Sequence, residues 1–373
     1  MVKNIFILGG YGNFGRYISK VLGKNPKIRL TLGGRHIDKA EALINTLELA
    51  HPAQALSCDI FHDFAKTLED LNPDIVIHTS GPFQGQGYRV AEACLKQGCH
   101  YIDLADSRDF VYGISQFDAE AREKKLFICS GASSLPALTS AIIDNYLTQF
   151  AVLEKIDYAI GTAQLTNQGL ATTAGVLSYA GKPFNCLING KQQAIYGWQG
   201  LRLQKFWQLG SRFLGNCDVP DLALFPERYP QLKTIQFQAG LELKPLQLIL
   251  FTLSWLVRLR LFLSLDKCAE TMLRISRWFN AIGHDNTGFY MDLFGHDLQQ
   301  QPKHLRFDIY AQHGDGLYIP CIPAILLAER LCEENLRLTG ASACVGQISL
   351  QDYLNCIKKL ELDIRWQDNL SLY

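Results

Sequence analysis

The 373-residue chain carries little charge and no excess of either sign. Lys and Arg together number 36, Asp and Glu also number 36, and charged residues make up only 19% of the sequence. A neutral chain lacks the basic face that displaces counterions from nucleic-acid phosphates, which argues against a general nucleic-acid binder. Apolar residues make up 48%. The low charged share excludes intrinsic disorder and indicates buried or membrane-facing surface beyond that of an ordinary soluble domain.

The cysteines lack the spacing of a zinc site or a redox centre. The 11 cysteines are scattered along the chain, none forms a Cys-x-x-Cys pair, and the closest two are Cys94 and Cys99. We therefore predict no metal site, and we expect reduced, buried thiols in a cytosolic protein.

The sequence also lacks the usual signals for export and for repeat architecture. Residues 1–4 lead directly into an apolar segment, without the charged start, apolar core and cleavage site of a signal peptide. We therefore expect a cytoplasmic protein, with attachment to a membrane surface left open. No internal repeat or low-complexity stretch is found, as expected for one compact catalytic unit.

The first third of the chain alternates short apolar runs with helical patterns. This alternation predicts an α/β fold in which a Rossmann-type, doubly wound parallel sheet is followed by a second α/β domain with a mixed sheet. The predicted strands are 3–8, 27–32, a third ending near 58–59, 74–79, 100–104 and 126–129. We predict a nucleotide-binding domain over 1–134, a substrate and dimerisation domain over 135–320, and a segment returning to the first domain over 321–373.

A glycine motif lies between the first strand and the first helix. The pattern Gly10-x-Gly12-x-x-Gly15 is weak alone, but here it directly follows a strand and opens a helix, which is the context it requires. Gly12 would let the backbone approach a pyrophosphate, and the helix N-terminus would offer N–H groups to the phosphates. We predict that this loop, including Asn13 and Phe14, binds a dinucleotide.

The end of the second predicted strand discriminates between NAD and NADP. An NAD site places an Asp or Glu there, whereas this sequence has Gly33, Gly34 and Arg35. A guanidinium binds a 2′-phosphate that a carboxylate would repel. We therefore predict NADP, with NAD less favoured, and Arg35 as the phosphate ligand. Asp59, after the third strand, is placed to meet the adenine edge, although an Asp there would also cap the following helix.

Several sequence blocks resemble the saccharopine dehydrogenase-like family. Besides the glycine motif and Gly33-Gly34-Arg35, they are Gly-Pro-Phe at 81–83, Tyr-Ile-Asp-Leu-Ala-Asp at 101–106, Gly-Ala-Ser-Ser-Leu-Pro at 131–136, Gly-Asp-Gly at 314–316, the apolar segment 324–331, Gly-Ala at 340–341 and Gly346. The similarity covers about residues 1–145 and 310–360. It implies a second α/β domain that supplies the substrate pocket and often a homodimer contact. It also implies an NAD(P)-dependent reaction on an amine or imine, a carbonyl or an enoyl group. The middle of the chain departs from the lysine-pathway enzymes, so saccharopine is not the predicted substrate.

Polar residues at the carboxyl ends of the central strands are the predicted reaction site. Small residues at Ser80, Gly81 and Pro82 leave room for a nicotinamide ring, and Ser133 follows the sixth strand. A hydride acceptor must also gain a proton, which Asp103, Asp106 or Tyr101 would supply or orient. Three of these residues also have a structural alternative: Asp106 and Ser133 as helix caps, and Asp103 as a partner in a structural hydrogen bond.

Residues 246–265 form an apolar segment that interrupts the middle of the chain. Its uncharged part, 246–257, is short for a membrane span, and Arg258 and Arg260 follow it. Three interpretations stay open: a buried core or interface helix, a helix lying on a membrane with Trp255 and Trp278 at headgroup depth, and a true span. The same surface would also suit a pocket for an apolar small-molecule substrate. Elsewhere in this region Asn189-Gly190 predicts a hairpin.

Together these features predict an NADP-dependent oxidoreductase of the saccharopine dehydrogenase-like type. Two alternatives remain: a non-catalytic NADP-binding sensor or scaffold, and a peripheral membrane protein that docks through helix 246–265.

Overall fold

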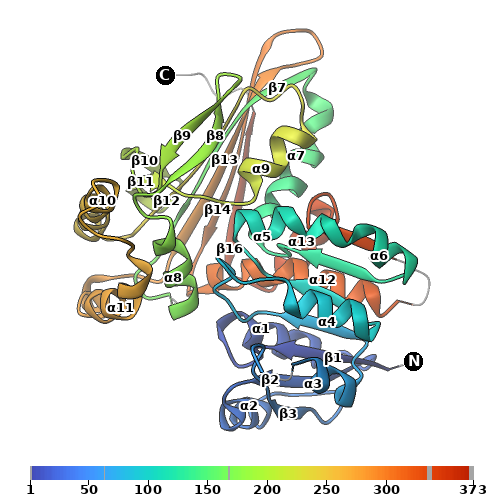
Figure 1. Cartoon of the computed structure of the whole chain (residues 1–373). Helices are drawn as coiled ribbons and strands as arrows, with labels where there is room; N and C mark the ends of the chain where they lie inside the picture. Colours follow the sequence, from blue (N-terminus) through green and yellow to red (C-terminus); the bar gives the residue numbers. More distant parts are fainter. Residues whose placement is uncertain (1, 63, 167–168, 334–337, 369–373) are drawn as a thin grey trace. The chain divides into compact units, whose positions relative to one another are not determined.

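A computed structural model describes residues 2–62, 64–166, 169–333 and 338–368. The chain divides into two compact units (Figure 1). The first comprises Met1–Ala141 and Tyr318–Cys356, and the second comprises Ile142–Leu317 and Ile357–Tyr373. Both units are therefore built from two separate stretches of chain.

The first unit contains a seven-stranded parallel sheet in the order β15-β6-β5-β4-β1-β2-β3. The sequence order reverses between β1 and β4, which is the topological switch point of a doubly wound sheet. The strands are β1 (Lys3–Leu8), β2 (Ile28–Gly34), β3 (Gln54–Ser57), β4 (Ile75–His78), β5 (His100–Asp103), β6 (Phe127–Ser130) and β15 (Gly340–Ala343). The predicted α/β, Rossmann-type fold is confirmed.

Helices connect these strands. They form where apolar residues recur along one face of the connecting segment. In α1 (Asn13–Leu22), for example, Ile18 and Leu22 are fully buried, whereas Arg16 and Lys20 are exposed. Strand β1 is buried along residues 5–8, as expected for a central parallel strand covered on both faces. The other helices are α2 (Ile37–Ile44), α3 (Phe64–Leu71), α4 (Arg89–Gln97), α5 (Arg108–Gly113), α6 (Asp118–Glu123), α12 (Ile322–Leu331) and α13 (Leu350–Ile357), and α7 (Thr139–Tyr146) leads into the second unit.

The carboxy-terminal segment differs from the prediction of a single return to the first domain. Residues 318–356 do belong to the first unit, where β15 pairs with β6. The chain then enters the second unit, where β16 (Leu362–Asp368) pairs with β14 (Pro302–Ala311). Ile364 and Trp366 alternate with polar residues along β16, so this strand matches a sheet with one polar face.

The second unit contains a seven-stranded mixed sheet in the order β10-β11-β12-β7-β13-β14-β16. Only β12 and β7 pair in parallel. The remaining strands are β7 (Val152–Gly161), β10 (Arg202–Phe206), β11 (Gly210–Asn216), β12 (Thr234–Gly240) and β13 (Thr287–His296), with a separate hairpin of β8 (Pro183–Ile188) and β9 (Lys191–Tyr196). The hairpin turn is Asn189-Gly190, both with positive φ, as its sequence predicts.

One face of this sheet is apolar and the other is ionic. The register places Tyr158, Met291 and Phe307 side by side on the apolar face. The neighbouring positions Asp157, Asp292 and Arg306 share the opposite face. Asp292 accepts hydrogen bonds from His304 and Arg306, and Asp308 accepts them from Arg306 and Arg365. The charged residues on this face are therefore paired with one another.

The apolar segment 246–265 is not one helix, contrary to prediction. Helix α10 runs from Lys244 to Arg258, and Arg260 then adopts a left-handed conformation with φ of 61° that ends the helical path. A loop leads to α11 (Ala269–Arg277). Helices α8 (Leu170–Ser178) and α9 (Asp221–Arg228) complete the unit. Within the described residues, no helix has both the length and the apolar character needed to cross a membrane.

Candidate functional site

The glycine loop lies at the switch point of the parallel sheet. Gly9 has a φ of 82°, and a Cβ there would lie 2.6 Å from Ser80 Oγ and 2.7 Å from Thr79 Oγ1. Thr79 Oγ1 donates to the carbonyl oxygens of Leu8 at 2.9 Å and Gly9 at 3.1 Å. The ends of β1 and β4 are therefore tied together, and only a residue without a side chain fits at Gly9.

Gly12 and Gly15 have different surroundings, although both belong to the motif. A Cβ on Gly15 would lie 2.3 Å from Gly9 O and 2.7 Å from Gly10 Cα, so Gly15 allows the helix to pack against the loop. Gly12 is exposed, has an ordinary φ of −69°, and a Cβ there would approach only Gly9 O, at 3.1 Å. The fold therefore requires a glycine at position 15 more strictly than at position 12.

The glycine loop leaves the start of α1 partly exposed to solvent at this edge of the sheet. Gly12 is the N-cap residue and makes no side-chain cap, and the first N–H groups of a helix have no acceptor within it. Asn13 and Phe14, both half-buried, form the first turn. Such an N-terminus favours an anion by its N–H groups and by the helix dipole.

The end of β2 is basic and contains a contact that the sequence analysis missed. Arg35 and His36 are exposed, directly after Gly34. The Tyr11 ring lies against Gly34, where a Cβ would be 2.6 Å from the ring, and its hydroxyl accepts the His36 N–H at 3.0 Å. Tyr11 thus fixes the backbone beside Arg35. It occupies a variable position of the motif, so spacing alone gave no signal for it.

Asp59 turns the chain after β3 and lies within electrostatic reach of Arg35. Its Oδ1 accepts the Phe61 N–H at 3.0 Å and its Oδ2 lies 3.3 Å from His62 Nδ1. The Phe61 hydrogen bond, followed by the His62 contact and the Arg35 charge, lowers the pKa of Asp59. Since α3 begins only at Phe64, Asp59 stabilises a turn and does not cap that helix.

Asp106 is a half-buried carboxyl in the loop after β5, and it contacts the loop after β4. Gln84 Nε2 donates to Asp106 Oδ1 at 3.0 Å, and burial raises the pKa of Asp106. Its neighbour Ser107 holds the N-cap position of α5, so Asp106 is not the helix cap. Ser80 and Gly81 are half-buried and Pro82 is exposed in the same region. Gln84 is a second residue that the sequence analysis missed, because a glutamine in a loop has no pattern of its own.

Tyr101 and Asp103 are completely buried and belong to a polar network inside the unit. Asp103 Oδ1 accepts hydrogen bonds from Gly131 N, Ala105 N and Ser130 Oγ at 2.8, 2.9 and 2.9 Å. Burial raises the pKa of Asp103 to about 6. The Tyr101 hydroxyl lies 3.1 Å from Nδ1 of His78. These contacts agree with the structural alternative for Asp103.

His78 was not singled out from the sequence, although it ends β4. It is fully buried, and burial lowers its pKa to about 3, so the imidazole is neutral at ordinary pH. Its ring packs edge-on against Phe83 with 5.0 Å between centroids. A buried neutral histidine beside a buried carboxyl makes this network sensitive to substitution.

Ser133 holds the N-cap position of the turn Ser134–Leu138 after β6, but its side chain makes no cap hydrogen bond. It is half-buried. The first unit thus brings the predicted residues to one edge of the parallel sheet, after β1, β2, β3, β4, β5 and β6.

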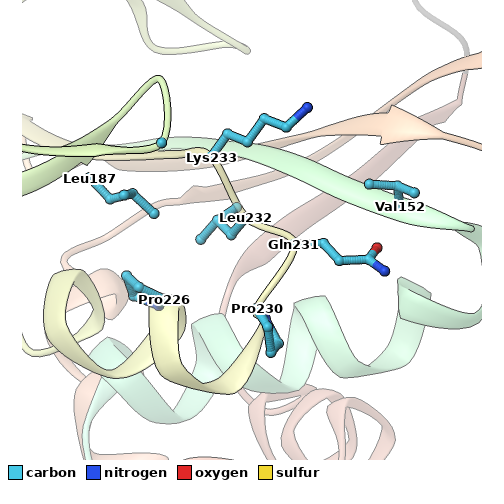
Figure 2. A pocket seen from close by; sticks show the side chains of 8 residues that line it. Val152, Leu187, Pro226, Pro230, Gln231, Leu232 and Lys233 are labelled. Carbon is cyan, nitrogen blue, oxygen red and sulfur yellow. The ribbon is translucent and has the colours of Figure 1, made fainter.

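Other parts of the chain offer less chemistry. A hollow of about 560 Å³ in the second unit is lined by Leu187, Pro226, Pro230, Leu232 and Lys233, among others (Figure 2). Lys233, the titratable residue of this lining, is ion-paired with Glu154. No cluster of metal-ligating side chains occurs among the described residues. All 11 cysteines are free thiols, and nine of them are buried.

Comparison with known families identifies the glycine-loop region. Residues 5–176 match the family model described as the saccharopine dehydrogenase NADP binding domain. This stretch is similar to the NADP-binding domain of the saccharopine dehydrogenase-like family. A search of curated proteins found no match. The predicted family and the predicted cofactor, NADP, are both confirmed by the domain match.

A solved structure extends the similarity to the whole chain at the level of the fold. Apo saccharopine dehydrogenase (L-Glu forming) from Saccharomyces cerevisiae has a TM-score of 0.71 at 13% identity, covering 99% of this chain and 100% of the yeast chain. An amine dehydrogenase from Mycobacterium smegmatis has a TM-score of 0.46 at 9% identity, covering 92% and 95% of the two chains.

The residues of this NADP-binding domain fit the cofactor. The end of β2 offers an exposed guanidinium and no carboxylate of its own, and the exposed Gly12 leaves space beside the start of α1. An adenosine 2′-phosphate needs the first feature, and a pyrophosphate needs the second.

Proposed function

We propose that the protein is an NADP(H)-dependent reductase that transfers hydride to an imine, a carbonyl or an enoyl group. The observation that carries the proposal is the conjunction of the switch-point glycine loop with Arg35 at the end of β2. In this proposal Arg35 binds the 2′-phosphate, the first turn of α1 binds the pyrophosphate, and Asp59 lies toward the adenine. Amine dehydrogenase and saccharopine dehydrogenase are the names of the similar structures. The substrate class that we propose for this chain is broader than either name.

The reaction needs a proton as well as a hydride. NADPH supplies the hydride when bound, and the acceptor atom that gains the electron pair must then take a proton. We assign Asp106 to that step, because it is half-buried and its pKa is raised by burial, which favours a protonated carboxyl at higher pH. Gln84 holds the carboxyl through its 3.0 Å hydrogen bond. Ser80, Gly81, Pro82 and Ser133 would border the nicotinamide.

Tyr101 and Asp103 have a different place in this proposal. Both are fully buried, so they orient the ends of β5 and β6 and do not contact a substrate directly. The three hydrogen bonds to Asp103 fix Ala105, immediately before Asp106, and Gly131, two residues before Ser133. They are therefore positioning residues for the loops that carry the proposed chemistry.

The cofactor assignment is tested by calorimetry with NADPH and NADH. Arg35→Ala should weaken NADPH binding by about 1–3 kcal/mol, the range for a charged hydrogen-bond partner, and change NADH binding little. Arg29→Ala is the matched control, because Arg29 is exposed near the other end of the same strand. Equal losses for both cofactors in Arg35→Ala would contradict the phosphate assignment.

Turnover is tested by following NADPH oxidation with imines, ketones and enoyl compounds. Asp106→Asn should lower kcat by about 10²–10⁴-fold, the usual contribution of a general acid, without weakening NADPH binding. The wild-type rate should fall as the pH rises through the raised pKa of Asp106, and Asp106→Asn should lose that dependence. Tight binding without turnover of any compound would favour the non-catalytic sensor instead.

A further inference from the structure

Helix α10 has the opposite polarity from an ordinary surface helix. Its buried positions are Gln247, Leu250, Ser254 and Val257, of which two are polar and completely buried. Its exposed positions include Leu248, Ile249 and Trp255, with 42%, 53% and 38% of their surface accessible. A helix facing water places polar residues outward. The outward face of α10 is therefore suited to an apolar medium.

Each of the two buried polar residues of α10 makes a hydrogen bond within the second unit, so this inversion is part of the fold. Gln247 Oε1 accepts the Leu241 N–H at 3.0 Å, and Ser254 Oγ donates to Phe251 O at 2.6 Å. Gly181 packs so closely that a Cβ there would lie against the Ser254 carbonyl oxygen. The helix is thus fixed with its apolar side outward.

The loop after α10 continues this apolar surface. Leu259, Leu261, Phe262 and Leu263 are 62%, 68%, 51% and 92% exposed, a run of large apolar side chains at a chain turn. After α11, Trp278 and Ile282 are 76% and 64% exposed. Figure 1 shows α10 and α11 on the same side of the second unit. We name residues 244–282 the apolar–basic segment.

Charge distinguishes this surface from one built to bind another protein by burial alone. The apolar–basic segment holds six basic and two acidic residues, although the whole chain is neutral. In the described part of the chain, Arg260, Lys267, Arg274 and Arg277 form no ion pair, and all four are exposed. Exposed leucines and tryptophans interleaved with unpaired cations are the composition of an interfacial membrane helix.

We propose that the apolar–basic segment docks the protein on the surface of an anionic lipid bilayer. The apolar side chains of α10 and of the following loop enter the interface. Trp255 and Trp278 lie at headgroup depth, and the unpaired basic residues meet lipid phosphates. A bilayer suits this surface better than a second copy of the chain does, because Leu263 projects from a turn almost fully exposed, and fluid lipid accepts such a projection without a matching groove.

The test is flotation of the purified full-length protein with vesicles of phosphatidylcholine, with and without phosphatidylglycerol. Wild type should float with the anionic vesicles and lose that binding as salt is raised. Leu263→Glu should lower the partition coefficient about tenfold or more, since a leucine side chain no longer enters the apolar phase. Leu298→Glu is the matched control, because Leu298 is 65% exposed in the turn between β13 and β14.

A second readout separates docking from misfolding and from self-association. Brominated lipids should quench the tryptophan emission of wild type, and Trp278→Phe should reduce that quenching while circular dichroism stays unchanged. Arg274→Glu with Arg277→Glu should remove the preference for anionic vesicles. The proposal is overturned if wild type does not float with anionic vesicles at low salt, or if Leu263→Glu floats as well as wild type. It is also overturned if ultracentrifugation shows a dimer that Leu263→Glu dissociates while no vesicle binding occurs.

Discussion

The two units place their polar groups in different parts of their sheets. In the first unit the parallel sheet is apolar through its centre, and the candidate site residues gather where the strands end. In the second unit the polar groups lie on a face of the sheet, where Asp157, Asp292 and Asp308 are almost completely buried. The second unit also exposes large apolar side chains close together in the chain, at Leu259 and at residues 261–263.

This contrast follows from sheet type. A parallel sheet covered on both faces leaves only its strand ends for polar chemistry. A mixed sheet with long antiparallel ladders allows one face to be polar, and β13 and β14 pair with each other over ten residues. A polar face that is also buried requires every charge to have a partner. The first unit thus depends on its strand ends for function, and the second depends on its ion pairs for stability.

The largest expected effect is the loss of Asp308, which is 1% exposed and joins two arginines. Arg306 Nε lies 3.0 Å and Arg365 Nη2 2.8 Å from its carboxylate. Asp308→Ala should lower the free energy of unfolding of the second unit by about 3–5 kcal/mol, because it removes the carboxylate partner of Arg365 and one of the two carboxylate partners of the buried Arg306. Urea denaturation followed by tryptophan fluorescence measures this unit specifically, since all five tryptophans lie in it.

Asp368→Ala is the matched control on the same sheet. Asp368 pairs with Lys303 at 2.9 Å, but its side chain is 53% exposed. An exposed pair contributes less than about 1 kcal/mol. If Asp308→Ala cost no more than Asp368→Ala, the buried ion pairs would not be what stabilises the second unit.

The next largest effect concerns the buried carboxyl of the first unit. Burial raises the pKa of Asp103 to about 6, above the ordinary value of 3.8, so the native state holds a proton that the unfolded state has released between these values. The stabilisation of the protonated form is therefore lost as the pH rises. Relative to Asp103→Asn, the unfolding free energy of wild type should fall by about 3 kcal/mol between about pH 4 and about pH 6. Urea denaturation followed by circular dichroism measures this change, and tryptophan fluorescence reports separately on the unfolding of the second unit.

His78, in the same network, should change the unfolding free energy with pH in the opposite direction. Its native pKa of about 3 lies below the ordinary 6.5, so its contribution is present at neutral pH and is lost as the pH falls. Relative to His78→Gln, wild type should therefore gain stability as the pH rises through this window. If the difference in unfolding free energy between wild type and variant did not change with pH for either substitution, neither Asp103 nor His78 would be buried as described.

The features that the sequence predicted are local ones. The strand, glycine loop and helix over residues 3–22 are adjacent in the chain, and Arg35 directly follows its strand, so pattern alone locates them. The contacts among His78, Tyr101 and Asp103 join β4 to β5, and no short pattern records which side chains meet across a sheet. The same holds for β16, whose partner β14 lies some sixty residues earlier. In the 246–265 segment the apolar pattern continued past Arg258, but the backbone reversed at Arg260.

The smallest expected effect separates a glycine of the fold from a glycine of the proposed cofactor site. Gly15→Ala should destabilise the first unit by about 1–3 kcal/mol, because the new Cβ would meet the backbone of Gly9 and Gly10. Gly12→Ala should destabilise the first unit less, since its φ is ordinary and its Cβ would approach only Gly9 O, at 3.1 Å, yet it should weaken NADPH binding about tenfold, or about 1.4 kcal/mol. Calorimetry with NADPH and circular dichroism in urea measure the two quantities on the same samples. Unweakened NADPH binding in Gly12→Ala would mean that the pyrophosphate does not approach the backbone at this position.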